Sequence, residues 1–318
     1  MKKGFIYRLI YGKGKSEDFT SRDLPKNRAG QFFYVFRTHF GKIFRINLLA
    51  GLCALPYLVW DYLLNGYVSR YMSGLSVQEQ FSQLLRMSLL QYGSEIPMIM
   101  LAFIGLAGAF YVIRKLCWGA PVRLINDFGK GVKQCYKQFL ALGFLTGVVN
   151  FAFNYLVNLN LLTVSQEVEF VYVLALALTA VAALVLFVAL VFALGQSALY
   201  NTGFFALVKN SFILTFKRLF RALGVCILSV LPMLVFRFFP WAFMQIIGGC
   251  VTLIIGIGFA VTMQTVLCLS VFDTFINAKS YPKFVNLGLR TGLNYLQAVA
   301  EDEPPETQEE GADDEDNG

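Results

Sequence analysis

The chain has 318 residues, of which 57% are apolar and only 15% are charged. Charged side chains make up about a quarter of an average soluble chain, so the composition excludes an ordinary soluble enzyme. The formal net charge of +7 hides a division, because residues 301–318 hold ten acids and no base. Since the bases elsewhere flank apolar segments, the expected partner is a lipid bilayer and not nucleic acid.

The first segment, residues 1–43, is predicted to be cytoplasmic and to carry an amphipathic helix. Between Gln31 and Arg45, five phenylalanines alternate with basic residues. This pattern is typical of a helix that lies in the membrane interface, with its aromatic side chains in the lipid. The single histidine, His39, falls within it. We interpret His39 as a polar residue at headgroup level and not as a catalytic base.

Six membrane-spanning helices are predicted within residues 44–274, since each needs about 20 predominantly apolar residues. They are placed at 44–66, 97–118, 139–161, 168–199, 221–244 and 247–274. The fourth is the clearest, because the run 171–194 has no charged residue. Between the first two, Ser76 and Glu79 have the spacing of a capping box. They predict a separate helix that lies on the outer surface and does not span.

The chain is predicted to end with a short cytoplasmic amphipathic segment at 275–300 and a disordered acidic tail at 301–318. The predicted orientation follows from the bases, because 24 of the 27 Lys and Arg lie in segments that alternate along the chain and so share one side. Bases accumulate on the cytoplasmic side, which places both termini in the cytoplasm of a multi-pass cell-membrane protein. Asp61, Glu95 and Arg237 fall near the outward ends, where ion pairing or solvation is expected.

An internal repeat is also predicted. Residues 40–59 align without gaps with residues 216–235, with eight identities that include Pro56 and Pro232. A weaker third copy begins at 127–137. The predicted fold class is therefore all-α: a polytopic membrane bundle of about six transmembrane helices, built as three parallel helical hairpins with cytoplasmic interfacial helices. Convergent use of Phe, Leu and basic residues remains an alternative explanation.

Polar residues inside the spans are the candidate functional residues, because an unsatisfied polar group is unfavourable in hydrocarbon. Asn150, Asn154 and Asn158 recur every four residues and therefore share one face of the third span. Together with Gln264 they form a predicted intramembrane polar seam. The seam either lines a solute path or joins helices by hydrogen bonds. No nucleophile–base pair, phosphate-binding loop or metal-ligand motif is present, so no enzymatic activity, cofactor or metal is expected.

Several short motifs recur in order along residues 10–290. They are YGKGK at 11–15, FF at 32–33, FGKIFRINLL at 40–49, GAFYVIRK at 108–115, DFGKG at 127–131, YN at 200–201 and NSF at 210–212. Together they resemble the YesL-like family of bacterial multi-pass membrane proteins. Members of that family have no established activity and are often encoded beside carbohydrate-uptake and polysaccharide-degradation systems in Gram-positive bacteria. The acidic tail departs from the family core.

The resemblance implies a non-enzymatic accessory or assembly component linked to carbohydrate or solute uptake. A sugar or solute transporter is then the expected protein partner. The alternative is that the chain is itself a small-solute transporter or channel, which the predicted repeat and the asparagine seam favour. An intramembrane enzyme is the weakest hypothesis because the sequence offers no reacting pair.

Overall fold

The computed structural model describes residues 24–164, 170–239 and 242–300. Every regular element in these ranges is a helix, and they contain no strand, which confirms the predicted all-α class. The acidic tail 301–318 and the first 23 residues of the segment 1–43 lie outside the described residues.

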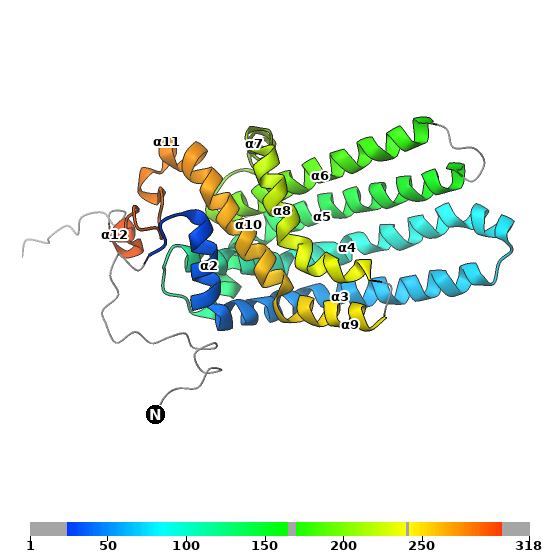
Figure 1. Cartoon of the computed structure of the whole chain (residues 1–318), viewed down its shortest axis with the longest axis horizontal. Coiled ribbons are helices and arrows are strands. Elements are labelled where there is room, and N and C mark those ends of the chain that lie inside the picture. Colours follow the sequence, from blue (N-terminus) through cyan, green and yellow to red (C-terminus); the bar gives the residue numbers. More distant parts are fainter. Residues whose placement is uncertain (1–23, 165–169, 240–241, 301–318) are drawn as a thin grey trace, which may run out of the picture.

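Four long helices lie side by side along the longest axis of the molecule (Figure 1). They are α3 (Phe40–Ser73), α4 (Val77–Cys117), α5 (Leu124–Val164) and α6 (Phe170–Leu199). Helix α4 packs between α3 and α5, and α5 packs in turn against α6. At about 1.5 Å per residue, the 41 residues of α4 extend well beyond a hydrocarbon core of roughly 30 Å.

The outer-surface helix that the sequence predicts is not a separate element. Its capping box is confirmed, since Ser76 Oγ accepts from the Glu79 backbone and the Glu79 carboxylate accepts from the Ser76 backbone. The helix begun there continues through Pro97 to Cys117. The predicted surface helix and the second span are therefore one helix, α4.

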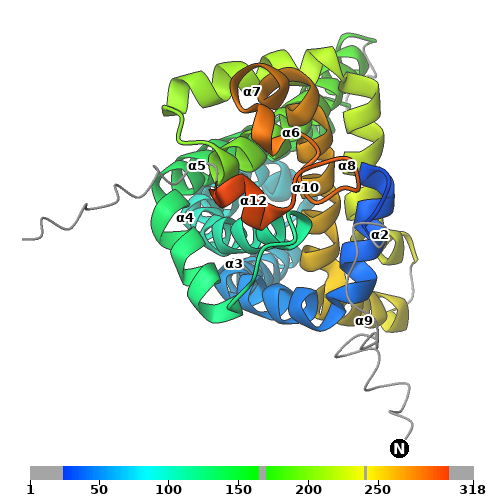
Figure 2. The same ribbon diagram turned by 90° about the vertical axis from the view of Figure 1, so that its left-hand side faces the viewer.

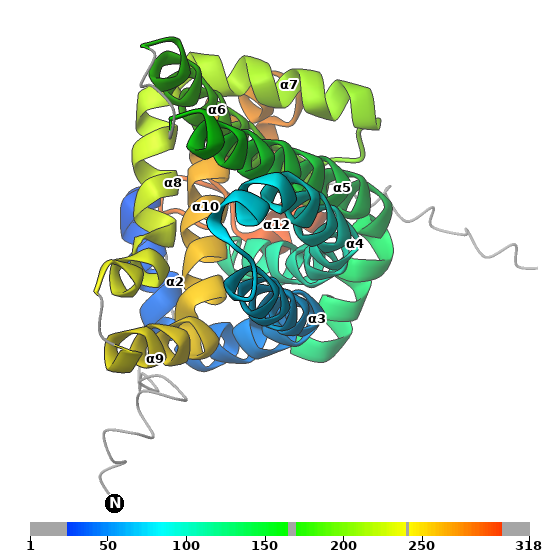
Figure 3. The same ribbon diagram turned by 90° about the vertical axis from the view of Figure 1, so that its right-hand side faces the viewer.

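The remaining elements form a second, shorter layer beside α3–α6. They are α2 (Arg28–Thr38), α7 (Phe204–Lys217), α8 (Leu219–Leu234), η2 (Val235–Phe238), α9 (Ala242–Val251), η3 (Thr252–Gly256), α10 (Ile257–Phe272), η4 (Asp273–Asn277), α11 (Ala278–Ser280), η5 (Pro282–Phe284) and α12 (Tyr295–Ala300). Helix α10 is central to this layer and packs against α2, α3, α4, α6 and α8. Figure 3 shows α8, α9 and α10 alongside the ends of α3–α6.

Among the residues that the structure describes, five helices are long and apolar enough to cross a membrane. These are Phe40–Ser73, Ser82–Cys117, Leu124–Leu159, Val173–Leu199 and Ile247–Ser280. The span predicted at 221–244 is not one long helix, because α8 has 16 residues and gives way to the 3₁₀ turn η2. Sixteen residues reach about 24 Å, short of a typical hydrocarbon core. The five helices indicate a membrane-embedded, multi-pass protein.

The predicted interfacial helix is divided at His39 into α2 and the start of α3. Asn27 caps α2 by accepting from the Gly30 backbone at 2.7 Å. The aromatic face was expected in lipid, but Phe32 and Phe36 both pack edge-on against Phe259 of α10. Only Phe33 of this helix points outward among its phenylalanines, with 70% of its surface exposed. The helix is therefore anchored on protein as well as at the surface.

The segment 275–300, which the sequence predicts to be amphipathic, consists of short helical turns and irregular chain. Its Phe284 ring stacks on Trp118 at the end of α4, with ring centroids 5.5 Å apart. The Arg290 backbone donates to Pro25 before α2. Figures 1 and 2 show α2 and α12 at the same end of the bundle. The first and last described helices thus lie together at the end of the molecule that holds most of the bases.

Candidate functional site

The three predicted asparagines of α5 lie against α4. Asn150 donates from Nδ2 to Glu95 Oε2 at 3.3 Å, and Asn158 donates to Ser88 Oγ at 2.7 Å. Asn154 donates to the backbone carbonyl and to Oδ1 of Asn150, at 2.8 and 3.1 Å. All three lie on α5, and two of them, Asn150 and Asn158, bond across to α4.

Gln264, the fourth predicted member of the seam, belongs to a different interface. It lies on α10 and donates from Nε2 to Ser229 Oγ of α8 at 3.0 Å. Ser229 is fully buried, and its own hydroxyl donates to the Cys226 carbonyl. The structure therefore separates the predicted seam into an α4–α5 cluster and an α8–α10 pair.

Helix α3 adds polar groups that the sequence analysis did not include. Gln91 of α4 donates to Asn65 Oδ1 at 2.8 Å, and Asn65 donates to Asp61 Oδ1 at 2.8 Å. Trp60 donates from its indole nitrogen to Ser94 Oγ at 3.0 Å. These bonds extend the cluster across α3, α4 and α5. The helical spacing of Ser88, Gln91 and Glu95 on one face was the available signal, but it falls across the predicted break before Pro97.

Glu95 is the most unusual member of this cluster. Its side chain was expected to be solvated or ion-paired near an outward end, yet the residue is only 2% exposed. One carboxylate oxygen accepts from Asn150, while the other is buried and has no hydrogen-bond partner. Among the described residues no basic group pairs with it; Asp61 and Tyr92 are the titratable groups that interact with it. A buried carboxyl without a cation can hold a proton or accept a cation.

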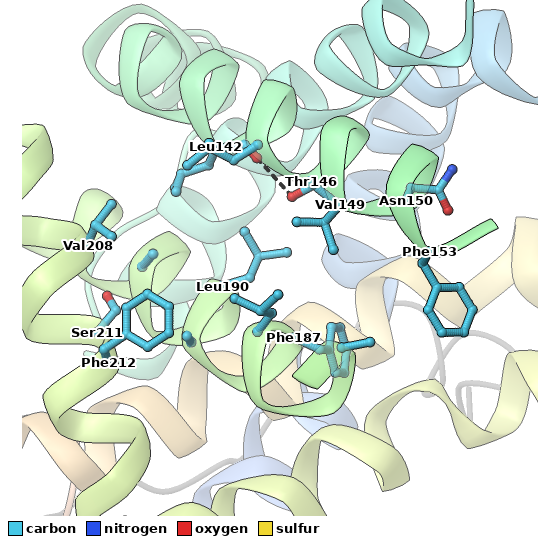
Figure 4. Close-up of a pocket in the computed structure, with 15 residues that line it drawn as sticks. Leu142, Thr146, Val149, Asn150, Phe153, Phe187, Leu190, Val208, Ser211 and Phe212 are labelled. Carbon is cyan, nitrogen blue, oxygen red and sulfur yellow. Dashed lines mark hydrogen bonds between the residues drawn. The ribbon is translucent and has the colours of Figure 1, made fainter. Parts of the chain in front are cut away.

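A cavity of about 280 Å³ opens on the far side of α5, between α5, α6 and α7 (Figure 4). Its wall is apolar, with Leu142, Val149, Phe187, Leu190 and Phe212 among the lining residues. Asn150 lies at its rim, and Ser211 contributes a hydroxyl that already donates to the Leu207 carbonyl. Such a wall suits a hydrocarbon chain or the side chains of another helix better than a sugar.

A second buried polar cluster lies at the base-rich end, and sequence reasoning missed it. Arg28 of α2 donates from Nε and Nη2 to Asp273 Oδ2, at 3.1 and 2.5 Å. Its Nη1 donates to Gln31 Oε1 at 2.7 Å and to the Leu287 carbonyl at 3.1 Å. The pair is 245 residues apart in sequence, so no local motif connects it.

Asp273 and Asn277 lie in η4, a π-helical turn, and such turns frequently occur at functional sites. Asn277 donates to Asp273 Oδ1 at 2.9 Å and accepts from the Tyr200 hydroxyl at 2.6 Å. Burial raises the pKa of Tyr200, so its phenol stays protonated and can donate. Each carboxylate oxygen of Asp273 therefore has a partner. We interpret this cluster as structural, because it joins α2 to η4.

His39 joins α2 to α3 and is half-buried, and it lines a cavity together with Gln31 and Trp118. Burial, with a smaller contribution from the charge of Lys42, lowers the pKa of His39 from 6.5 to about 4. The imidazole is therefore neutral near pH 7.

Within the described ranges, no group of three or more His, Cys, Asp or Glu is placed to hold a metal ion. No family model, curated protein or solved structure matches this chain. Evidence for its function therefore comes from its polar clusters and its cavities.

Proposed function

We propose that this chain is a non-enzymatic membrane component that assembles with a sugar or solute transporter, as its resemblance to the YesL-like family implies. The observation that carries the proposal is that the asparagines of α5 form hydrogen bonds with other protein groups. Asn158 donates across to Ser88 of α4, and Asn154 donates within α5 to Asn150, which itself donates across to Glu95 of α4. Hydrogen bonds of this kind hold membrane helices together. The seam then acts as a structural joint in a scaffold.

The apolar cavity between α5, α6 and α7 supports the same proposal. A transmembrane helix of a partner presents apolar side chains, and a wall that contains Leu142, Leu190 and Phe212 is complementary to them. A polar solute finds few hydrogen-bonding groups there.

The proposed topology has six passages, with both termini in the cytoplasm. Helix α8 and its extension η2 would make the fifth passage, in a locally thinned part of the bilayer. Support comes from α2 and α12, which lie at the same end of the bundle, as an even number of passages would place them (Figure 1).

The proposed repeat is supported at two of its three copies. Helix α2 is joined at His39 to α3, which contains Pro56. Helix α7 is joined at Arg218 to α8, which contains Pro232. The third copy departs from this pattern, because α5 runs unbroken from Leu124.

Site-directed photocrosslinking in native membranes tests the accessory role. A photoreactive residue replaces Leu145, which lines the cavity and is exposed, or Leu178, an exposed control on α6 that does not line it. We expect the permease subunit of an uptake transporter, identified by mass spectrometry, to be captured from position 145 and not from 178. Capture of the same proteins from both positions, or of lipid alone, contradicts the proposal.

The second candidate function, a small-solute carrier or channel, is favoured by Glu95. Its buried carboxyl oxygen without a partner is a feature that a structural joint does not need. Proton flux into proteoliposomes would support this candidate if Glu95→Gln abolished it and Gln264→Leu, in the separate α8–α10 pair, did not. Flux that survives Asn150→Leu with Asn154→Leu would remove the seam from any transport path.

A further inference from the structure

A third cavity, of about 360 Å³, lies at the base-rich end between α7 and the segment formed by η4 and α11. Its lining differs from that of the apolar cavity. It includes two basic residues, Lys217 and Lys279, and three polar ones, Thr202, Asn210 and Ser280. No Asp or Glu lines it. The cavity therefore presents positive charge and hydrogen-bond donors to whatever occupies it.

Neither lysine has its positive charge neutralised by an acidic residue in the described part of the chain. The Nζ atom of Lys217 lies 4.8 Å from the centre of the Phe275 ring, which positions the ammonium without neutralising it. Lys279 is exposed, and neither lysine is in an ion pair within the described part of the chain. The acidic residue of the adjoining turn, Asp273, is already paired with Arg28.

Thr202 supplies an independent observation. Its Oγ1 is buried and has no hydrogen-bond partner, although the atom belongs to a residue that lines the cavity. By contrast, the Tyr200 hydroxyl is committed to Asn277, and the Gln196 amide is committed to Ser211. An unpartnered buried hydroxyl is unfavourable, and a rotation of this side chain toward the cavity would let it donate to a ligand there.

Helix α7 and the start of α8 carry exposed aromatic side chains next to these lysines. Phe205, Phe216 and Phe220 are 88%, 67% and 87% exposed. Exposed phenylalanines beside lysines are typical of a helix at the membrane interface, with the rings among acyl chains and the ammonium groups at headgroup depth. The cavity therefore opens where lipid phosphates lie.

We propose that this cavity binds the phosphate of an anionic phospholipid headgroup. The two ammonium groups attract the negative charge of the phosphodiester, and the Thr202 hydroxyl donates to a phosphate oxygen. Basic pockets at the cytoplasmic side of helical bundles recognise lipid headgroups by the same chemistry. The proposal stands apart from the accessory and carrier roles, since neither role requires a bound lipid.

Native mass spectrometry of the full chain, released from nanodiscs of phosphatidylcholine with a minority of phosphatidylglycerol, tests the site. We expect the protein to retain phosphatidylglycerol in preference to phosphatidylcholine. The double variant Lys217→Gln with Lys279→Gln should retain about tenfold less of the anionic lipid. A control with the same net charge, Lys133→Gln with Lys209→Gln, replaces exposed lysines outside the cavity and should stay within about twofold of the parent. Equal loss in both double variants, or loss in neither, overturns the proposal.

Two further experiments test the role of Thr202 and distinguish a lipid phosphate from a free phosphate. Thr202→Val keeps the charge, so a several-fold loss of bound phosphatidylglycerol with unchanged thermal unfolding supports the site even if the lysine variant folds poorly. Unchanged lipid retention in Thr202→Val contradicts it. Inorganic phosphate alone is added in the last arm. If it binds and displaces the lipid at millimolar concentration, the cavity takes a soluble phosphate and the lipid assignment is wrong.

Discussion

Arg28 and Asp273 form a buried ion pair that joins helix α2 to the π-helical turn η4, with Nη2 and Oδ2 2.5 Å apart. Both side chains are 8% exposed. The pair fastens the beginning of the described chain to the end of α10. Because Arg28 also donates to the Leu287 carbonyl, it holds the segment after α11 in the same place.

Breaking this pair on one side should destabilise the protein strongly. Asp273→Asn leaves the Arg28 guanidinium buried without its counter-charge, and the expected loss in the free energy of unfolding is about 3–5 kcal/mol. The double variant Arg28→Gln with Asp273→Asn leaves no buried charge and should recover much of that loss. Thermal unfolding in detergent, followed by tryptophan fluorescence, measures both. Equal losses in the single and double variants would show that the charges do not interact.

Neutralising Glu95 should not destabilise the bundle. Glu95→Gln keeps an oxygen that accepts from Asn150 and removes a buried charge that has no basic partner in the described ranges. We therefore expect the unfolding temperature at pH 7 to stay the same or rise. Asn150→Leu removes the one hydrogen bond that the described residues make to the carboxyl and should cost about 1–2 kcal/mol. Glu79→Gln, at an exposed carboxyl, is the control and should give no gain. A marked loss in Glu95→Gln would mean that the charge is needed for folding.

His39 should make stability depend on acid pH. The pKa of His39 is about 4 in the folded protein and near 6.5 when unfolded, so the unfolded state binds the proton more readily. The contribution is fully present above pH 6.5 and is lost as the pH falls toward 4, by at most about 3 kcal/mol. His39→Gln should flatten the unfolding temperature between pH 6.5 and 4 relative to the parent chain. An identical pH profile in the two proteins would contradict this assignment.

Gly288 should tolerate no side chain, whereas Gly119 should tolerate one at modest cost. Both have positive φ, at 79° and 74°. A methyl group on Gly288 would overlap the Cys117 carbonyl oxygen, while one on Gly119 would meet open space. Gly119→Ala carries only the backbone strain of about 1 kcal/mol. Gly288→Ala should lose clearly more stability and expose residues 285–300 to limited proteolysis. Similar unfolding temperatures for the two variants would contradict the close contact.

The sequence predicted the helical class, a span within each of the five long apolar helices and the capping box of α4, because each depends on local composition and spacing. It also placed Asn150, Asn154 and Asn158 on one face. It did not reveal that α4 continues through Pro97, since proline normally interrupts a helix. As a result, the segment that contains Ser88 and Gln91 was predicted to be a separate helix on the outer surface.

Long-range pairings were beyond the reach of sequence patterns. Nothing local indicates that Arg28 meets Asp273 or that Gln264 bonds to Ser229 in place of the α5 asparagines. The burial of Glu95 was missed for the same reason, because its position near an outward end suggested water. The length of α8 also depends on tertiary packing, and it decides whether the chain crosses the membrane five or six times.

The most direct test of the six-passage topology is a pair of reporter fusions in intact cells, one before Met1 and one after Gly318. Each site carries either a green fluorescent protein, which fluoresces when cytoplasmic, or an alkaline phosphatase, which is active when exported. An even number of passages, with the base-rich end inside, predicts fluorescence and no phosphatase activity at both ends. Fluorescence at the first site with phosphatase activity at the second would mean five passages, with α8 lying in the membrane without crossing it.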